Sequence, residues 1–119
     1  MSLTEAIIGI GMAMTCAMSC AAPLLACPQS VPTKSGRAPL VLADVFDGPP
    51  EDMASQIPDL RTFEWELASS QDDAKQRGRP YYLVCRYKKT ALTVTFKIPY
   101  EVKSCKLDGI KGGVAVACR

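Results

Sequence analysis

Histidine is the most consequential absence, because none of the 119 residues is one. Histidine is the usual general base beside a serine or cysteine nucleophile, and it is a common zinc ligand. A nucleophilic catalytic site and a zinc site would therefore both lack their usual histidine. No C-x-x-C spacing occurs after residue 26, and no glycine-rich loop precedes a helical pattern. These absences remove the familiar redox, zinc and phosphate-binding motifs. We therefore expect no metal, no cofactor and no enzymatic activity.

Paired carboxylates are the one catalytic pattern that remains, at 51–52, 64–66 and 72–73. Two acids facing one another could hydrolyse a glycosidic bond. Each pair has a simpler structural explanation. The acids at 51–52 suit a helix N-terminus, those at 64–66 suit the polar face of a strand, and those at 72–73 suit a loop. A carboxylate-dependent hydrolase is therefore the least favoured function.

Charge is missing from residues 6–26, AIIGIGMAMTCAMSCAAPLLA. A run of this kind with a small-residue end is typical of a secretory signal, with cleavage after Ala21 or after Ala26. We predict a signal peptide at 1–26 and a single exported domain at 27–119, periplasmic or secreted. The alternative is a membrane anchor, since about 20 apolar residues can cross a bilayer. The membrane becomes a partner only if this segment is retained.

Four of the six cysteines, Cys27, Cys85, Cys105 and Cys118, fall in the expected exported domain. An even number in an oxidising compartment predicts two disulfides. A lipid on Cys27 would leave an odd thiol, which argues against a lipoprotein. We favour the pairs Cys27–Cys85 and Cys105–Cys118, and the rival scheme is Cys85–Cys105 with Cys27–Cys118.

Alternating apolar residues predict short strands over most of the domain. We expect an α+β fold: an antiparallel sheet of five or six strands, with a meander in the last forty residues and one short helix near 49–57. The two-residue period places Phe63, Trp65 and Leu67 on one face, where core packing is the favoured role of the tryptophan. The segments 28–39 and 69–80 are expected to be extended or loop structure. The strands are expected at 40–46, 61–68, 81–87, 91–98, 101–107 and 114–119.

The first hairpin of this meander has a definite expected register. If Lys88 and Lys89 form a two-residue turn, Cys85 lies opposite Leu92, and the apolar faces of the two strands coincide.

Charge is divided between the two halves of the domain. Between residues 44 and 73 there are nine acids and one base, whereas residues 75–119 carry eleven bases and two acids. An exported protein with a formal net charge of +2 is a poor candidate for nucleic-acid binding. The division instead suits a polarised surface that meets a protein partner. The candidate partner surface comprises Asp47, Glu51, Asp52, Tyr82, Arg86, Lys88 and Lys89.

Several segments together resemble one known group of proteins. Cys27-Pro28, FDGPPEDMASQIPD at 46–59, WEL at 65–67, YLVCRYKKT at 82–90 and the two later cysteines are similar to an uncharacterised family of small exported proteobacterial proteins. Tyr82 stands where a tryptophan is expected. Some members are encoded in type VI secretion loci, where small periplasmic proteins neutralise cell-wall-degrading effectors.

The resemblance implies a non-enzymatic periplasmic protein that binds and inhibits a protein partner, in the manner of an immunity protein. The cell-wall-degrading effector is the expected partner. The alternative is an envelope-associated structural protein that is held by its N-terminal segment.

Overall fold

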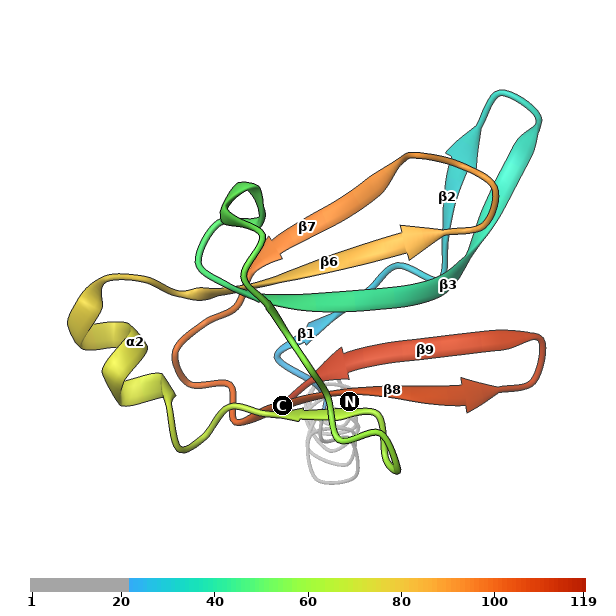
Figure 1. The fold of residues 1–119 in the computed structure, drawn as a ribbon. Helices are drawn as coiled ribbons and strands as arrows, with labels where there is room; N and C mark the ends of the chain where they lie inside the picture. The colour runs from blue at the N-terminus through green and yellow to red at the C-terminus, as the bar shows by residue number, and fades with distance from the viewer. Residues whose placement is uncertain (1–21) are drawn as a thin grey trace, which may run out of the picture.

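Two antiparallel sheets make up the protein, and the computed structural model describes residues 22–119 (Figure 1). The first sheet has the order β1 (Leu25–Ala26), β9 (Gly113–Cys118), β8 (Ser104–Ile110) and β5 (Glu64–Glu66). The second has the order β2 (Ser30–Thr33), β3 (Gly36–Asp47), β6 (Tyr81–Tyr87) and β7 (Thr93–Lys97), and β4 (Ser55–Gln56) pairs with β3.

The core lies where the two sheets meet, and β3 contacts β9 across it. On β6 the alternate side chains Tyr81, Leu83, Cys85 and Tyr87 are all buried, as a strand with one face on a core requires. Among residues 22–119, the largest fully buried side chains are Leu40, Val45, Leu83, Cys85, Ile98, Val102, Cys105, Val116 and Cys118.

Both favoured disulfides are present. Cys27 bonds to Cys85 with a Cα–Cα distance of 5.8 Å, and this bond ties the start of the domain to the middle of β6. Cys105 bonds to Cys118 directly across the β8–β9 pair. One bridge therefore lies at each sheet, and all four cysteines are buried.

The α+β class is confirmed, but the arrangement of strands differs from the expectation. The structure has two sheets where a single sheet of five or six strands was expected. The expected C-terminal meander is divided, because β6 and β7 lie in one sheet and β8 and β9 in the other. The segment 98–103 connects them through the core, with Ile98 and Val102 fully buried.

The helix near 49–57 was predicted wrongly. This segment holds a single 3₁₀ turn, η1 (Pro50–Asp52), which ends at Met53 in a left-handed conformation with φ 58°. Within residues 22–119 the α-helix is α2 (Gln71–Arg77), which begins just after Ser70 in a segment that was expected to be a polar loop. Gln71 and Ala74 are its buried residues. The Gln71 side-chain amide donates to the carbonyls of Pro99 (3.2 Å) and Val102 (2.8 Å), so a polar contact seats this helix.

The register of the β6–β7 hairpin was also predicted wrongly, by two residues. Cys85 lies opposite Val94, so the turn is longer than Lys88-Lys89. Lys89 adopts a left-handed φ of 54°, and the Thr90 hydroxyl accepts a hydrogen bond from the Leu92 amide at 3.1 Å. A shift of two residues preserves which face each side chain occupies, so the buried face of β6 was still predicted correctly.

One further expectation is wrong at a single residue. Phe63 does not share the buried face of Trp65, because its left-handed φ of 53° turns it outward, where it is 48% exposed. Trp65 itself is buried as predicted, and its indole N–H donates to the Gln56 carbonyl at 3.0 Å. The segment 28–39, which was expected to be extended or loop structure, contains β2 and the start of β3, which form a hairpin.

Candidate functional site

The structure does not bring the seven predicted surface residues together. Asp47 ends β3, opposite Tyr81 at the start of β6, whereas Lys88 follows the other end of β6. The predicted acidic and basic residues therefore occupy opposite ends of one sheet.

The acidic end is largely neutralised within the fold. The Arg79 guanidinium lies 3.4 Å from the Asp47 carboxylate and 3.0 Å from that of Asp52, and it also donates to the Asp47 carbonyl. Arg77 adds a longer contact of 3.8 Å to Asp47. A hydrogen bond from Arg77 to Asp73 raises the pKa of the arginine, so it stays charged. These acids hold arginines in place and do not cap a helix as expected.

Two candidate residues on β6 are also partly engaged within the fold. Arg86 forms an ion pair with Asp44 on the neighbouring strand β3, and Tyr82 is half-buried. Glu51 lies in the 3₁₀ turn and is exposed. Tyr82 lies near the start of β6, whereas Arg86 lies near its end and is followed by Lys88 and Lys89.

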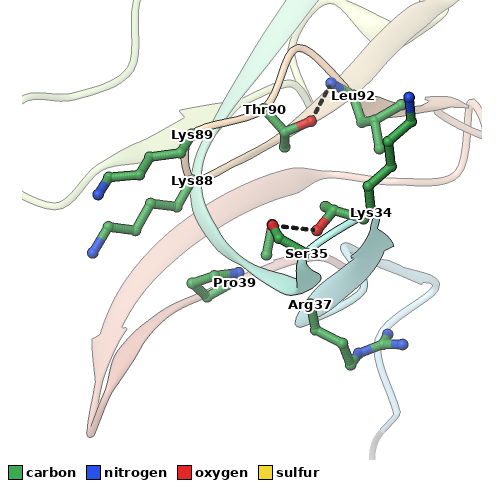
Figure 2. A pocket seen from close by; sticks show the side chains of 10 residues that line it. Lys34, Ser35, Arg37, Pro39, Lys88, Lys89, Thr90 and Leu92 are labelled. Atoms are coloured by element: carbon green, nitrogen blue, oxygen red, sulfur yellow. Dashed lines mark hydrogen bonds between the residues drawn. The ribbon is translucent and has the colours of Figure 1, made fainter.

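The basic end contains a concave site, which we call the notch. It has a volume of about 550 Å³ and lies between the β2–β3 turn and the β6–β7 turn (Figure 2). Its lining residues include four cations and no acid: Thr33, Lys34, Ser35, Arg37, Ala38, Pro39, Lys88, Lys89, Thr90 and Leu92. Figure 2 shows Lys88 and Lys89 side by side at one side, and Lys34 and Arg37 at the other.

Backbone and side-chain hydrogen bonds fix the shape of the notch. The Lys88 amide donates to the Pro39 carbonyl at 3.0 Å, which joins the start of the β6–β7 turn to β3. The Arg37 guanidinium donates to the hydroxyl and the carbonyl of Ser30, at 2.7 and 3.1 Å, so it is held along the hairpin. The Thr33 hydroxyl donates to the Gly36 carbonyl at 3.1 Å and closes the β2–β3 turn.

Tyr87 anchors the base of the β6–β7 turn. Its hydroxyl donates to the Pro28 carbonyl at 2.7 Å, next to the Cys27–Cys85 bridge. Burial raises the pKa of the Tyr87 phenol. The turn that carries Lys88 and Lys89 is thus connected to the N-terminal segment both covalently and by a hydrogen bond.

Sequence reasoning identified Lys88 and Lys89 but missed Lys34 and Arg37. Both lie in the segment 28–39, which was expected to be extended or loop structure. A signal was present: Lys34-Ser35-Gly36 has turn composition between two short β-like segments, and Gly36 adopts a φ of 130° at this turn.

Two negative findings apply to residues 22–119. No group of histidine, cysteine or acidic side chains there is arranged to hold a metal ion. No helix there has the length and apolar character needed to cross a bilayer.

The described residues thus form a small two-sheet domain with two disulfides and an exposed basic notch. A comparison with protein families matches residues 34–119 to the model of the type VI secretion system Tli immunity protein. The match covers most of the chain, so the protein belongs to this family. It is accordingly an immunity-type protein that binds and blocks a partner effector. Neither the curated proteins nor the solved structures contain a match.

Proposed function

We propose that this protein works in the periplasm, where it neutralises a type VI effector by forming a complex with it and without catalysing a reaction. Membership of the immunity family over residues 34–119 is the observation that carries this proposal. The fold suits the role, because a frame with a disulfide at each sheet loses little conformational freedom on binding. The identity of the effector as a cell-wall-degrading enzyme stays a prediction.

Two features support export to an oxidising compartment. Disulfides persist in the periplasm and outside the cell but are rare in the reducing cytosol. The sequence of residues 6–26 has the composition of a secretory signal, although residues 1–21 lie outside the described part of the chain.

The pairing of strand β1 favours one of the two cleavage sites expected for the signal peptide. Leu25 and Ala26 pair with Cys118 and Ala117 in the first sheet, and the Leu24 amide donates to the Cys118 carbonyl at 2.9 Å. Cleavage after Ala26 would remove this strand, whereas cleavage after Ala21 would retain it. We therefore propose processing after Ala21, which leaves Ser19 and Ala21 at the −3 and −1 positions.

Co-expression tests the proposed function. Each type VI effector of the producing bacterium is expressed with a periplasmic export signal in a test host, with or without this chain. We expect the full chain to restore growth against one effector. A matched variant that lacks residues 2–21 stays in the cytoplasm and should give no protection. Failure of the full chain against every effector, or equal protection by the truncated chain, would contradict the proposal.

A further inference from the structure

We propose that the notch receives an extended acidic segment of the effector, whose carboxylates pair with Lys34, Arg37, Lys88 and Lys89. This inference rests on the proposed function and names the chemistry of the partner at one site. The site is formed by two turns that lie far apart in the sequence, at 33–39 and 88–92.

The charges of the notch are available to a partner. Among residues 22–119, Lys34, Lys88 and Lys89 form no ion pair, and Arg37 is held by the uncharged Ser30. By contrast, three other arginines, Arg77, Arg79 and Arg86, each contact an aspartate within the fold. The lining of the notch contains no carboxylate, so its cations lack a counter-charge close by.

The shape of the notch fits an extended polypeptide segment of the partner. Its cations lie on two sides, and Ala38, Pro39 and Leu92 supply an apolar part of the wall. Successive side chains of an extended segment point to opposite sides, so acids placed in it can meet lysines on both sides. A concave, hydrogen-bonded site is also less suited to a flat bilayer surface than to a protruding peptide. We therefore assign the notch to a protein segment and not to anionic lipid.

The notch is organised before the partner arrives. The Lys88–Pro39 hydrogen bond fixes the β6–β7 turn against β3, and the Thr90 side chain holds the turn beyond Lys89. Lys89 keeps a left-handed φ of 54°, a conformation that non-glycine residues adopt at some energetic cost. Binding then requires the ordering of lysine side chains but no rearrangement of the backbone.

Charge reversal at the notch tests this inference on the processed, exported protein. The variant K34E/K88E/K89E changes three exposed side chains, and K97E changes an exposed lysine at the far end of β7. The probe is the effector that the co-expression experiment identifies, titrated calorimetrically. We expect the triple variant to lose affinity by about 100-fold and K97E to stay within about threefold of the unaltered protein. Unchanged far-ultraviolet circular dichroism and melting temperature show that both variants fold.

Three outcomes would overturn the inference. The first is that the triple variant binds the effector within about threefold of the unaltered protein. The second is affinity that does not fall as salt rises from about 0.05 to 0.5 M, since complementary exposed charges are screened. The third is that the unaltered protein binds vesicles of about 30% phosphatidylglycerol through these lysines while the triple variant still binds the effector.

A synthetic peptide separates failure of this inference from failure of the proposed function. It consists of about four Glu-Gly repeats, and the control replaces each Glu with Gln. If no effector is neutralised, the proposed function fails, but the peptide still tests the notch. Preference for the Glu peptide that is lost in K34E/K88E/K89E and kept in K97E supports an acidic ligand. Equal binding of the two peptides contradicts it.

Discussion

Arg79 lies directly against the backbone of Gly48. A Cβ atom at position 48 would lie 2.3 Å from the Arg79 Cζ, and Gly48 has a φ of 83°. The two acids that flank this glycine, Asp47 and Asp52, bind the same guanidinium. The segment 47–52 therefore binds the guanidinium of Arg79, which follows α2 in the sequence.

Replacement of Gly48 with alanine should destabilise the protein by about 1–3 kcal/mol, because the arginine must move and the backbone is strained. Gly109→Ala is the matched control, since nothing lies within 4 Å of its added Cβ. Urea unfolding of both variants measures the difference. In an Arg79→Ala background the cost of Gly48→Ala should shrink to the backbone strain alone. An undiminished cost would show that the close approach of Arg79 does not matter.

The two disulfides should contribute unequally to stability. They close sequence separations of 58 and 13 residues. Loop-closure entropy assigns about 4 kcal/mol to Cys27–Cys85 and about 3 kcal/mol to Cys105–Cys118. Guanidinium unfolding of C27S/C85S and C105S/C118S, each with the other bridge intact, measures both values. A greater loss from C105S/C118S would contradict the dominance of the long loop.

Tyr87→Phe should lower stability by about 1 kcal/mol near neutral pH, because the hydrogen bond to the Pro28 carbonyl is lost. The Tyr82 hydroxyl has no hydrogen bond within residues 22–119, so Tyr82→Phe is the matched control and should be close to neutral.

The effect of Tyr87 also depends on pH. Burial raises the pKa of Tyr87, so the folded state holds the phenolic proton more tightly than the unfolded state does. This contribution is fully present below the unfolded pKa of about 10 and is lost as pH rises through the folded pKa. Stability of the unaltered protein should fall faster than that of Tyr87→Phe above about pH 10. Parallel curves in that range would show that Tyr87 titrates identically in both states.

Gln71→Ala should destabilise the protein by about 1–3 kcal/mol, since it leaves the carbonyls of Pro99 and Val102 without their donor. Gln76→Ala, at an exposed position of α2, is expected to be neutral or slightly stabilising. Hydrogen exchange of the α2 amides gives a second readout. Without the two Gln71 hydrogen bonds, α2 should open before the rest of the protein. Equal effects of the two substitutions would contradict the proposed seating.

The sequence predicted the elements that depend on side-chain alternation and on cysteine parity. The buried face of β6 and the presence of two disulfides are correct for these reasons, whereas the favoured pairing rested on the position of Cys105 and Cys118 on the two arms of the last hairpin. The missed elements depend on contacts that a local pattern does not contain. Helix α2 is seated by a glutamine that reaches residues 99 and 102, so it carries no apolar period.

Local backbone conformation accounts for other errors. Left-handed residues at Met53, Phe63 and Lys89 end a turn, reverse a side chain and lengthen a hairpin, and none is a glycine that would have marked the position. The notch was only half predicted for a related reason. Its two turns are brought together by the pairing of β3 with β6, a long-range contact that no local sequence pattern specifies.

Titration of the identified effector with the purified protein tests the central claim most directly. The effector is held at a fixed concentration well above the dissociation constant, and its residual activity is measured at increasing molar ratios. Blocking by binding predicts a linear fall in activity to zero at one molecule of this protein per effector, independent of incubation time. Progressive loss of activity at a small fraction of that ratio would reveal catalysis, and full activity in the presence of excess protein would show that it does not block this effector.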